Sequence, residues 1–364
     1  MLPRYQEIIN NLHKRILGGE FGEEGKLPSE AQLMSEFETS RITVTRALQE
    51  LELKGIIYKI KGKGSFVSRK RKSGEESRII SLVLPHKEDF FSGGQQYVRG
   101  VYKSCQERGY LCSVHYSEQS SRKEKQILEE ISQHQVAGAI IYPISNRNIN
   151  QLSRLNISGF PLVLLDRRLK ELDLPVVISN NFEGALELVT YLTEMDHRRI
   201  GFVGAMDSEA VSRRYQGYCR ALVNRKIPLD SSVVFSKFNC GSDEDQQILC
   251  EEEATTILTK LLTEGATAVF CVNDLIAYRM LKAARDLGLS VPEDLSIAGF
   301  DNMRYFSESN VELTTEAQDY EAICRGCVSL LLEIIEKGPE HEPEPLIIPT
   351  TFIPGNTVRR VKKI

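Results

Sequence analysis

Short apolar runs that alternate with amphipathic segments dominate the chain from residue 79 onward, and this alternation restricts the fold more than any other feature. The runs cover residues 79–84, 136–142, 162–165, 200–203, 268–272 and 295–300. Strands buried on both faces are continuously apolar, and helices supply the crossovers between parallel strands. The pattern therefore predicts an α/β fold with parallel sheets flanked by helices. Because about 285 residues exceed what one sheet needs, we expect two lobes with a cleft between them.

The charge of the 364-residue chain is distributed unevenly, although its net value is only −4. Residues 1–74 hold 14 Lys and Arg against 9 Asp and Glu, whereas the rest holds 32 against 41. A basic segment on an acidic body suits a polyanionic partner that one end of the molecule contacts. Chance variation over such a short segment is the alternative, and sequence motifs are needed to distinguish it from a polyanion-binding role.

The basic segment predicts three helices. The first has apolar residues at helical spacing and ends at Gly18-Gly19; its buried face holds Tyr5, Ile9, Leu12 and Ile16. Ser29 and Gln32 form the capping box of a second helix. The third helix spans residues 41–53, and its buried stripe consists of Val44, Ala47, Leu48 and Leu51.

A β-hairpin is predicted to follow the helices. The alternating runs 56–60 and 65–67 are joined by Lys61-Gly62-Lys63-Gly64, which places two lysines at a flexible tip. Three helices and a basic hairpin make a winged helix-turn-helix, and the polar end of its third helix can enter a DNA major groove about 12 Å wide. Each piece alone also fits a purely structural role, as a cap, a turn or a solvated helix face. Their order makes DNA binding the favoured interpretation.

The same segment resembles the winged-helix domain of GntR-family bacterial transcription regulators. The resemblance lies in LPSE at 27–30, SRITV at 40–44, Ala47, Leu48, Leu51, Gly55 and GKGSFV at 62–67, and it spans nearly all of residues 3–68. It implies that Arg41 contacts a guanine or a phosphate, that Ile42 and Thr43 line the groove, and that Lys61 with Gly62 reaches the minor groove. The candidate DNA-binding residues are Ser40, Arg41, Ile42, Thr43, Thr45, Arg46, Lys61, Gly62 and Lys63.

Two departures limit this resemblance. Many GntR members have Arg where this chain has Ala31 and Thr45, so those two DNA contacts do not transfer and Arg46 is the expected substitute. The operator sequence is therefore not implied. We expect a DNA-binding domain at residues 1–68, a linker at 69–77 that contains four consecutive basic residues, and a ligand-binding and dimerisation domain at 78–364.

The second domain resembles the effector domain of LacI/GalR repressors, which has a type I periplasmic-binding-protein fold. The stretches that carry the resemblance are 161–169, 196–204, 212–222, 270–302 and 313–319, among which VPEDLSIAGFD is highly specific. The resemblance implies two lobes, a hinge crossed three times, a ligand between the lobes and a dimer interface. A GntR-like head on a LacI-like body is also similar to the plan of arabinose-responsive repressors.

The resemblance implies a set of effector-binding residues. Arg214, Asn273 and Asp301 occupy ligand-contact positions of the family. Further candidates are Asp166 at a strand end, Ser179 near the first crossover, and Phe90 or Phe91, where the family stacks an aromatic ring on its ligand. Carboxylates, an amide and a guanidinium suit the hydroxyls of a sugar, which both donate and accept. A structural alternative remains for each, such as a helix cap or, for Arg214, an internal ion pair.

Catalysis finds little support in the sequence. It contains no phosphate-binding G-x-x-x-x-G-K-[ST], no H-E-x-x-H and no G-x-S-x-G, and its 6 histidines are scattered. Cys324-x-x-Cys327 lies in an apolar helical stretch, which favours buried thiols over zinc. We expect a cytoplasmic, homodimeric regulator without cofactor or metal, which a sugar releases from operator DNA. A sugar-processing enzyme with a nucleic-acid tether is the alternative, and arabinose, other monosaccharides or a nucleoside are open as ligands.

Overall fold

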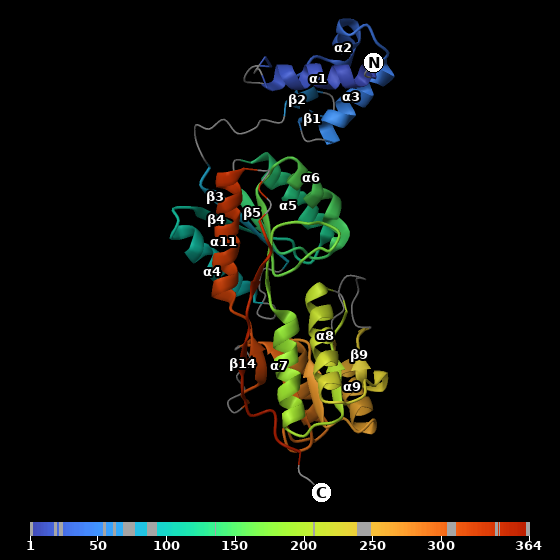
Figure 1. The fold of residues 1–364 in the computed structure, drawn as a ribbon, viewed down its shortest axis with the longest axis vertical. Helices are drawn as coiled ribbons and strands as arrows, with labels where there is room; N and C mark the ends of the chain where they lie inside the picture. The colour runs from blue at the N-terminus through green and yellow to red at the C-terminus, as the bar shows by residue number, and fades with distance from the viewer. Residues whose placement is uncertain are drawn as a thin grey trace.

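The computed structural model (Figure 1) describes most of the chain. The described residues are 3–17, 20–21, 25–53, 56–60, 63–67, 77–85, 93–134, 136–206, 208–238, 249–303, 311–338, 341 and 343–361. The predicted linker at 69–77 lies outside them except for Ser77. The architecture is α/β, as predicted, with parallel sheets flanked by helices and a helical segment at the N-terminus.

The N-terminal segment, called the head, has the predicted three helices and hairpin. Its elements are α1 (Arg4–Leu17), α2 (Glu30–Glu36), α3 (Arg41–Leu53), β1 (Ile57–Ile60) and β2 (Gly64–Val67), and β1 pairs antiparallel with β2. The capping box of Ser29 and Gln32 is present at the start of α2. The predicted stripe of α3 is buried against α1 and α2, together with Ile8, Leu12 and Leu33. Apolar spacing and caps therefore account for this fold.

The first lobe of the body is built on a six-stranded sheet in the order β13-β7-β6-β5-β3-β4. Its strands are β3 (Ile79–Leu84), β4 (Leu111–Tyr116), β5 (Gly138–Ile141), β6 (Leu162–Leu165), β7 (Val176–Ser179) and β13 (Leu346–Ile348). One face packs on α4 (Gly94–Gln106) and α11 (Tyr320–Lys337), and the other on α5 (Ser121–Gln133) and α6 (Ile149–Ile157). Helices on both faces explain why the central strands are apolar throughout.

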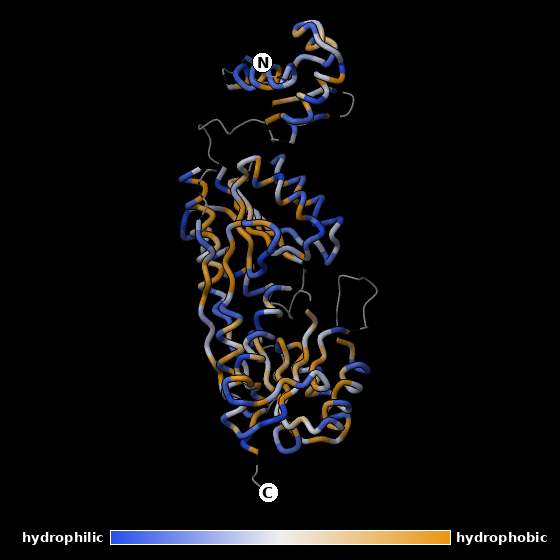
Figure 2. Tube along the Cα trace, turned by 45° about the vertical axis from the view of Figure 1, so that its right-hand side comes forward, coloured by the Kyte–Doolittle hydropathy of each residue, from blue (hydrophilic) through white to orange (hydrophobic). Residues whose placement is uncertain are grey.

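The second lobe repeats this plan with the order β14-β12-β11-β10-β8-β9. Its strands are β8 (Ile200–Val203), β9 (Val234–Phe235), β10 (Ala268–Cys271), β11 (Ser296–Asp301), β12 (Thr314–Ala317) and the antiparallel β14 (Thr351–Ile353). Its helices are α7 (Asn181–Glu194), α8 (Glu209–Asn224), α9 (Glu251–Thr263) and α10 (Asp274–Asp286). Gly217 lets α8 approach α7 closely, because a Cβ there would lie 2.5 Å from the carbonyl oxygen of Phe182. Figure 2 shows the hydrophobic strands at the centre of each lobe.

The chain crosses between the lobes three times within the described residues. The crossings lead from β7 to α7, from β12 to α11 and from β13 to β14. At the first and third crossings, the backbone amide of Asn180 donates to the carbonyl oxygen of Ile348 at 2.7 Å. The expected hinge of three crossings is therefore present. It brings the carboxyl ends of several parallel strands together, which is where α/β proteins bind ligands.

Candidate DNA interface and ligand site

The exposed start of α3 is the candidate DNA-reading surface. The Ile42 side chain is 82% exposed, which is unusual for a large apolar residue, and the Arg41 side chain is 76% exposed. Ser40 precedes the helix, and its Oγ lies 3.0 Å from Thr43 Oγ1. Thr45 is half-buried. An exposed apolar residue beside a guanidinium suits base edges, where a thymine methyl and guanine acceptors lie in the major groove.

Ion pairs hold this surface in place. The Arg41 Nε donates to Glu30 Oε2 at 3.2 Å, and Lys59 Nζ of the hairpin donates to Glu30 Oε1 at 3.0 Å. The hydrogen bond from Lys59 is the main cause that lowers the pKa of Glu30. Arg46 stacks over the ring of Tyr5, with its Cζ 4.1 Å from the ring centroid. The start of α3 is thus linked to the hairpin.

The candidate residues of the hairpin tip are described only in part. Lys63 is exposed, whereas Lys61 and Gly62 lie outside the described residues.

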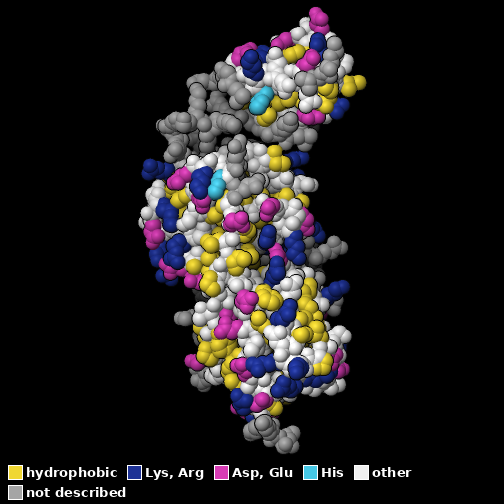
Figure 3. Space-filling model, in the orientation of Figure 1, with side chains coloured by type: hydrophobic (Ala, Val, Ile, Leu, Met, Phe, Trp, Pro, Cys, Tyr) yellow, Lys and Arg dark blue, Asp and Glu magenta, His cyan; other side chains and the backbone are white. Residues whose placement is uncertain are grey.

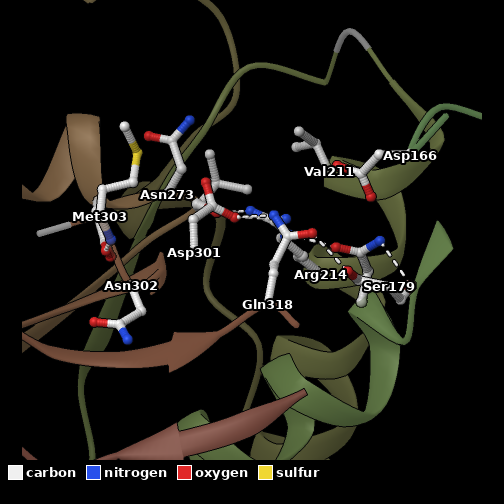
Figure 4. A network of polar contacts seen from close by, with 12 residues as sticks. Asp166, Ser179, Val211, Arg214, Asn273, Asp301, Asn302, Met303 and Gln318 are labelled. Carbon is white, nitrogen blue, oxygen red and sulfur yellow. Dashed lines mark hydrogen bonds and ion pairs between the residues drawn. The ribbon is translucent and has the colours of Figure 1, made fainter. Parts of the chain in front are cut away.

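In the body, a buried ion pair forms the centre of the candidate ligand site (Figure 4). Arg214 of α8 and Asp301 at the end of β11 lie 2.9 Å apart, with exposed side-chain fractions of 7% and 10%. Arg214 also donates to Asn181 Oδ1 at 2.7 Å and to the carbonyl oxygen of Val272 at 2.6 Å, while its Cζ lies 3.7 Å from the centroid of the Phe300 ring. Burial raises the pKa of Asp301, and the positive charge of Arg214 opposes this effect.

Gln318 links this ion pair to the hinge. Its Nε2 donates to Asp301 Oδ1 at 2.7 Å, and its Oε1 accepts from Ser179 Oγ at 2.5 Å. Ser179 ends β7 just before the first crossing, and Gln318 lies in the second. Asp301 is therefore connected through Gln318 to two of the three crossings.

Asp166 lies at the end of β6 and is 8% exposed. The Tyr97 hydroxyl donates to its Oδ2 at 2.7 Å, whereas its Oδ1 has no hydrogen-bond partner within the described residues. Burial raises the pKa of Asp166 to about 6, although the Tyr97 hydrogen bond and the charge of Arg214 lower it. Its backbone φ of 54° is in the left-handed region, and such local strain clusters at functional sites.

The remaining effector candidates differ in their surroundings. Asn273 is half-buried and caps α10, because its Oδ1 accepts from the amide of Ile276 at 2.9 Å. This bond matches the helix-cap alternative that the sequence left open. The cap uses the Asn273 side-chain oxygen and does not involve its side-chain nitrogen. Phe90 and Phe91 lie outside the described residues.

Sequence reasoning missed two residues of the network, Asn181 and Gln318. Gln318 directly follows β12, and Asn181 begins α7 two residues after the end of β7, so both lie where the chain passes between the lobes. Polar side chains at that position of a parallel sheet were the available signal. Their contacts with Arg214 and Asp301 depend on the tertiary fold.

Two kinds of feature are absent from the described residues. They contain no group of three or more His, Cys, Asp or Glu that could hold a metal ion. None of their helices is long and apolar enough to span a membrane. On the face shown in Figure 3, basic and acidic side chains lie next to one another where the lobes meet.

Comparisons with known proteins agree with this geometry. Residues 4–67 match the bacterial regulatory proteins of the gntR family, and residues 189–358 match the periplasmic binding protein-like domain. The arabinose metabolism transcriptional repressor of Geobacillus stearothermophilus is 30% identical over 99% of both chains. The repressor CytR of Escherichia coli K12 is 32% identical over 71% of this chain and 73% of its own. A LacI-family regulator of Enterococcus faecium with bound ribose shares the fold, with a TM-score of 0.65, 24% identity and coverage of 78% of this chain and 100% of its own.

A winged-helix head and a two-lobed, hinged body together define a transcriptional regulator. The chain belongs to the family of bacterial transcriptional repressors that join a GntR-type DNA-binding domain to a LacI/GalR-type periplasmic binding protein-like domain. The sequence-based predictions of fold class, family and DNA-binding function are confirmed.

The raised pKa of Asp166 gives a prediction for stability. The folded chain releases the Asp166 proton near pH 6 and the unfolded chain near the ordinary value of 3.8, so the folded state binds more protons between these values. Stability therefore falls as the pH rises through this window. We expect the free energy of unfolding of the ligand-free Asp166→Asn variant to rise by about 1 kcal/mol, relative to that of the wild type, as the pH increases from 5 to 7.5.

Chemical denaturation at several pH values measures this difference. Asp173→Asn is the matched control, because the Asp173 side chain is 94% exposed. A difference between Asp166→Asn and wild type that does not change with pH would contradict the prediction.

Proposed function

We propose that this repressor binds operator DNA through the start of α3 and the β1–β2 hairpin, and that a small neutral sugar in the interlobe cleft releases it. The contact that carries the proposal is the Arg214–Asp301 pair, which is connected through Gln318 to two of the three crossings. A sugar hydroxyl that exchanges hydrogen bonds with this pair changes the partners of hinge residues. The relatives named for arabinose metabolism and the fold neighbour with ribose support a sugar of pentose size.

The mechanism is allosteric and involves no chemical conversion of the ligand. A ligand with higher affinity for the closed cleft shifts the two lobes toward closure, and the shift alters how the heads are held. Typical coupling free energies of about 1–3 kcal/mol correspond to roughly 5- to 150-fold changes in affinity. The protein acts in the cytoplasm, without cofactor or metal. Of the effector candidates, Arg214, Asp301, Asp166, Ser179 and Asn273 are assigned to ligand binding.

The operator complex is proposed to contain a homodimer, so that two heads bind a pseudo-palindromic site. The structure leaves Leu111 68% exposed and Tyr102 54% exposed. Leu111 begins β4, the edge strand of the first sheet, and Tyr102 lies on the neighbouring α4. Exposed apolar residues along an unpaired sheet edge favour association with a second copy.

Leu111→Lys is expected to convert the dimer to a monomer, because the lysines would be desolvated in the interface. Light scattering after gel filtration should give twice the chain mass of 41.2 kDa for the wild type and one chain mass for the variant. Ile157→Lys, at an apolar position on α6 that is 60% exposed, should remain dimeric. A monomeric wild type would contradict the proposed dimer.

Arg41→Ala and Asp301→Asn should separate operator binding from sugar binding. Loss of one guanidinium contact in the groove should weaken operator binding by about 10- to 100-fold and leave sugar binding intact. Asp301→Asn keeps the shape of the buried site but removes its charge, so it should weaken sugar binding instead.

Fluorescence anisotropy with operator DNA at fixed salt and thermal-shift assays with L-arabinose, D-ribose and cytidine measure the two activities. Arg325→Ala, an exposed arginine on α11, is the control for loss of a positive charge. Equal loss of both activities in Arg41→Ala would contradict this division of roles.

A further inference from the structure

An open groove of about 450 Å³ runs along α7 of the second lobe, where α7 lies beside the edge strand β14. It contains none of the residues of the Arg214–Asp301 network. Carboxylates and apolar side chains line it together, namely Glu183, Glu187, Glu194, Leu186, Tyr191 and Phe352. Those of α7 recur at helical spacing and form a stripe of about 16 Å, because a helix rises about 1.5 Å per residue.

The apolar part of the groove is only half covered. The rings of Tyr191 and Phe352 contact each other, with their centroids 4.7 Å apart. Both rings and Leu186 are half-buried, so part of their surface faces solvent. An aromatic face that is open to solvent can pack against an aliphatic chain or a cation.

The acidic part of the groove lacks counter-ions. Glu183 and Glu187 are exposed, lie one helical turn apart, and have no ion-pair partner within the described residues. Like charges at this spacing are unfavourable on a helix. Only Glu194, at the end of the stripe, is compensated, by an ion pair with Arg225. Figure 3 shows acidic and hydrophobic side chains next to one another over α7.

A further carboxyl group lies beneath this stripe. Glu316 is buried, is opposite Phe352 in the pairing of β12 with β14, and has its Cγ 2.8 Å from where a Cβ of Gly184 would lie. Burial and the charge of Glu187 raise the pKa of Glu316 to about 7, although a hydrogen bond with Thr350 opposes them. Partial ionisation of Glu316 at neutral pH therefore adds to the negative potential around the groove.

We infer that the α7 groove is a docking surface for a basic amphipathic helix of a partner protein. Lysine and arginine side chains match both parts of the groove, because their aliphatic stems can cover Tyr191 and Phe352 while their charged ends pair with Glu183 and Glu187. A helix of about three turns matches the length of the stripe, and helices commonly bind in apolar grooves. The inference goes beyond the proposed function and is independent of sugar and operator binding.

Fluorescence anisotropy of the full chain at low ionic strength tests the inference with two labelled peptides. Both have about 18 residues, which is long enough to form a helix. One is an amphipathic helix of Lys and Leu, and the other has Glu in place of Lys. The wild type should bind the Lys peptide at least about 10-fold more tightly than the Glu peptide, because the groove is acidic.

Glu187→Lys should weaken binding of the Lys peptide by about 10-fold or more and strengthen binding of the Glu peptide, because it reverses a charge at the centre of the groove. The gain for the Glu peptide distinguishes a local charge effect from a loss of folding. Glu252→Lys, the same exchange at an exposed position on α9, is the matched control and should bind both peptides as the wild type does.

Three results would overturn the inference and leave the proposed function intact. The first is a wild type that binds the Lys peptide no more tightly than the Glu peptide. The second is an equal effect of Glu187→Lys and Glu252→Lys, which would show that only net charge matters. The third is a change of oligomeric mass in Glu187→Lys, measured by light scattering, which would show that a second copy of the chain occupies the groove.

Discussion

The buried ion pair between Arg214 and Asp301 is the contact around which the candidate ligand site is built. Two charges removed from water are stable only when further hydrogen bonds satisfy them. Asn181, the carbonyl oxygen of Val272 and Gln318 supply these bonds. These groups lie at the start of α7, just after β10 and in the second crossing, so the ion pair links three segments that are distant in sequence.

Backbone strain marks the same region. Asp166, Asp301 and Asn302 have φ values of 54°, 107° and 55°, and all three follow or end parallel strands of the two sheets. Such conformations are unfavourable for residues other than glycine and persist where the surrounding structure enforces them. The strained strand ends therefore place carboxylates of both lobes close to the segments that join the lobes.

Local sequence predicted much of this molecule. The features that it did not predict depend on residues that are distant in sequence. The capping box of Ser29 and the apolar stripe of α3 depend on near neighbours, so they predicted the head well. The polar strand β12, with the sequence TTEA, was missed because its burial comes from the strands and helices around it. The contact of Gln318 with Ser179 joins residues 139 positions apart, which no local pattern encodes.

The most direct test of the account measures operator affinity of the full chain with and without a ligand that calorimetry has shown to bind. If occupancy of the cleft repositions the heads, saturating ligand should weaken operator binding by about 5- to 150-fold at constant salt. An operator affinity that stays the same while the cleft is saturated would contradict the coupling between ligand and DNA binding.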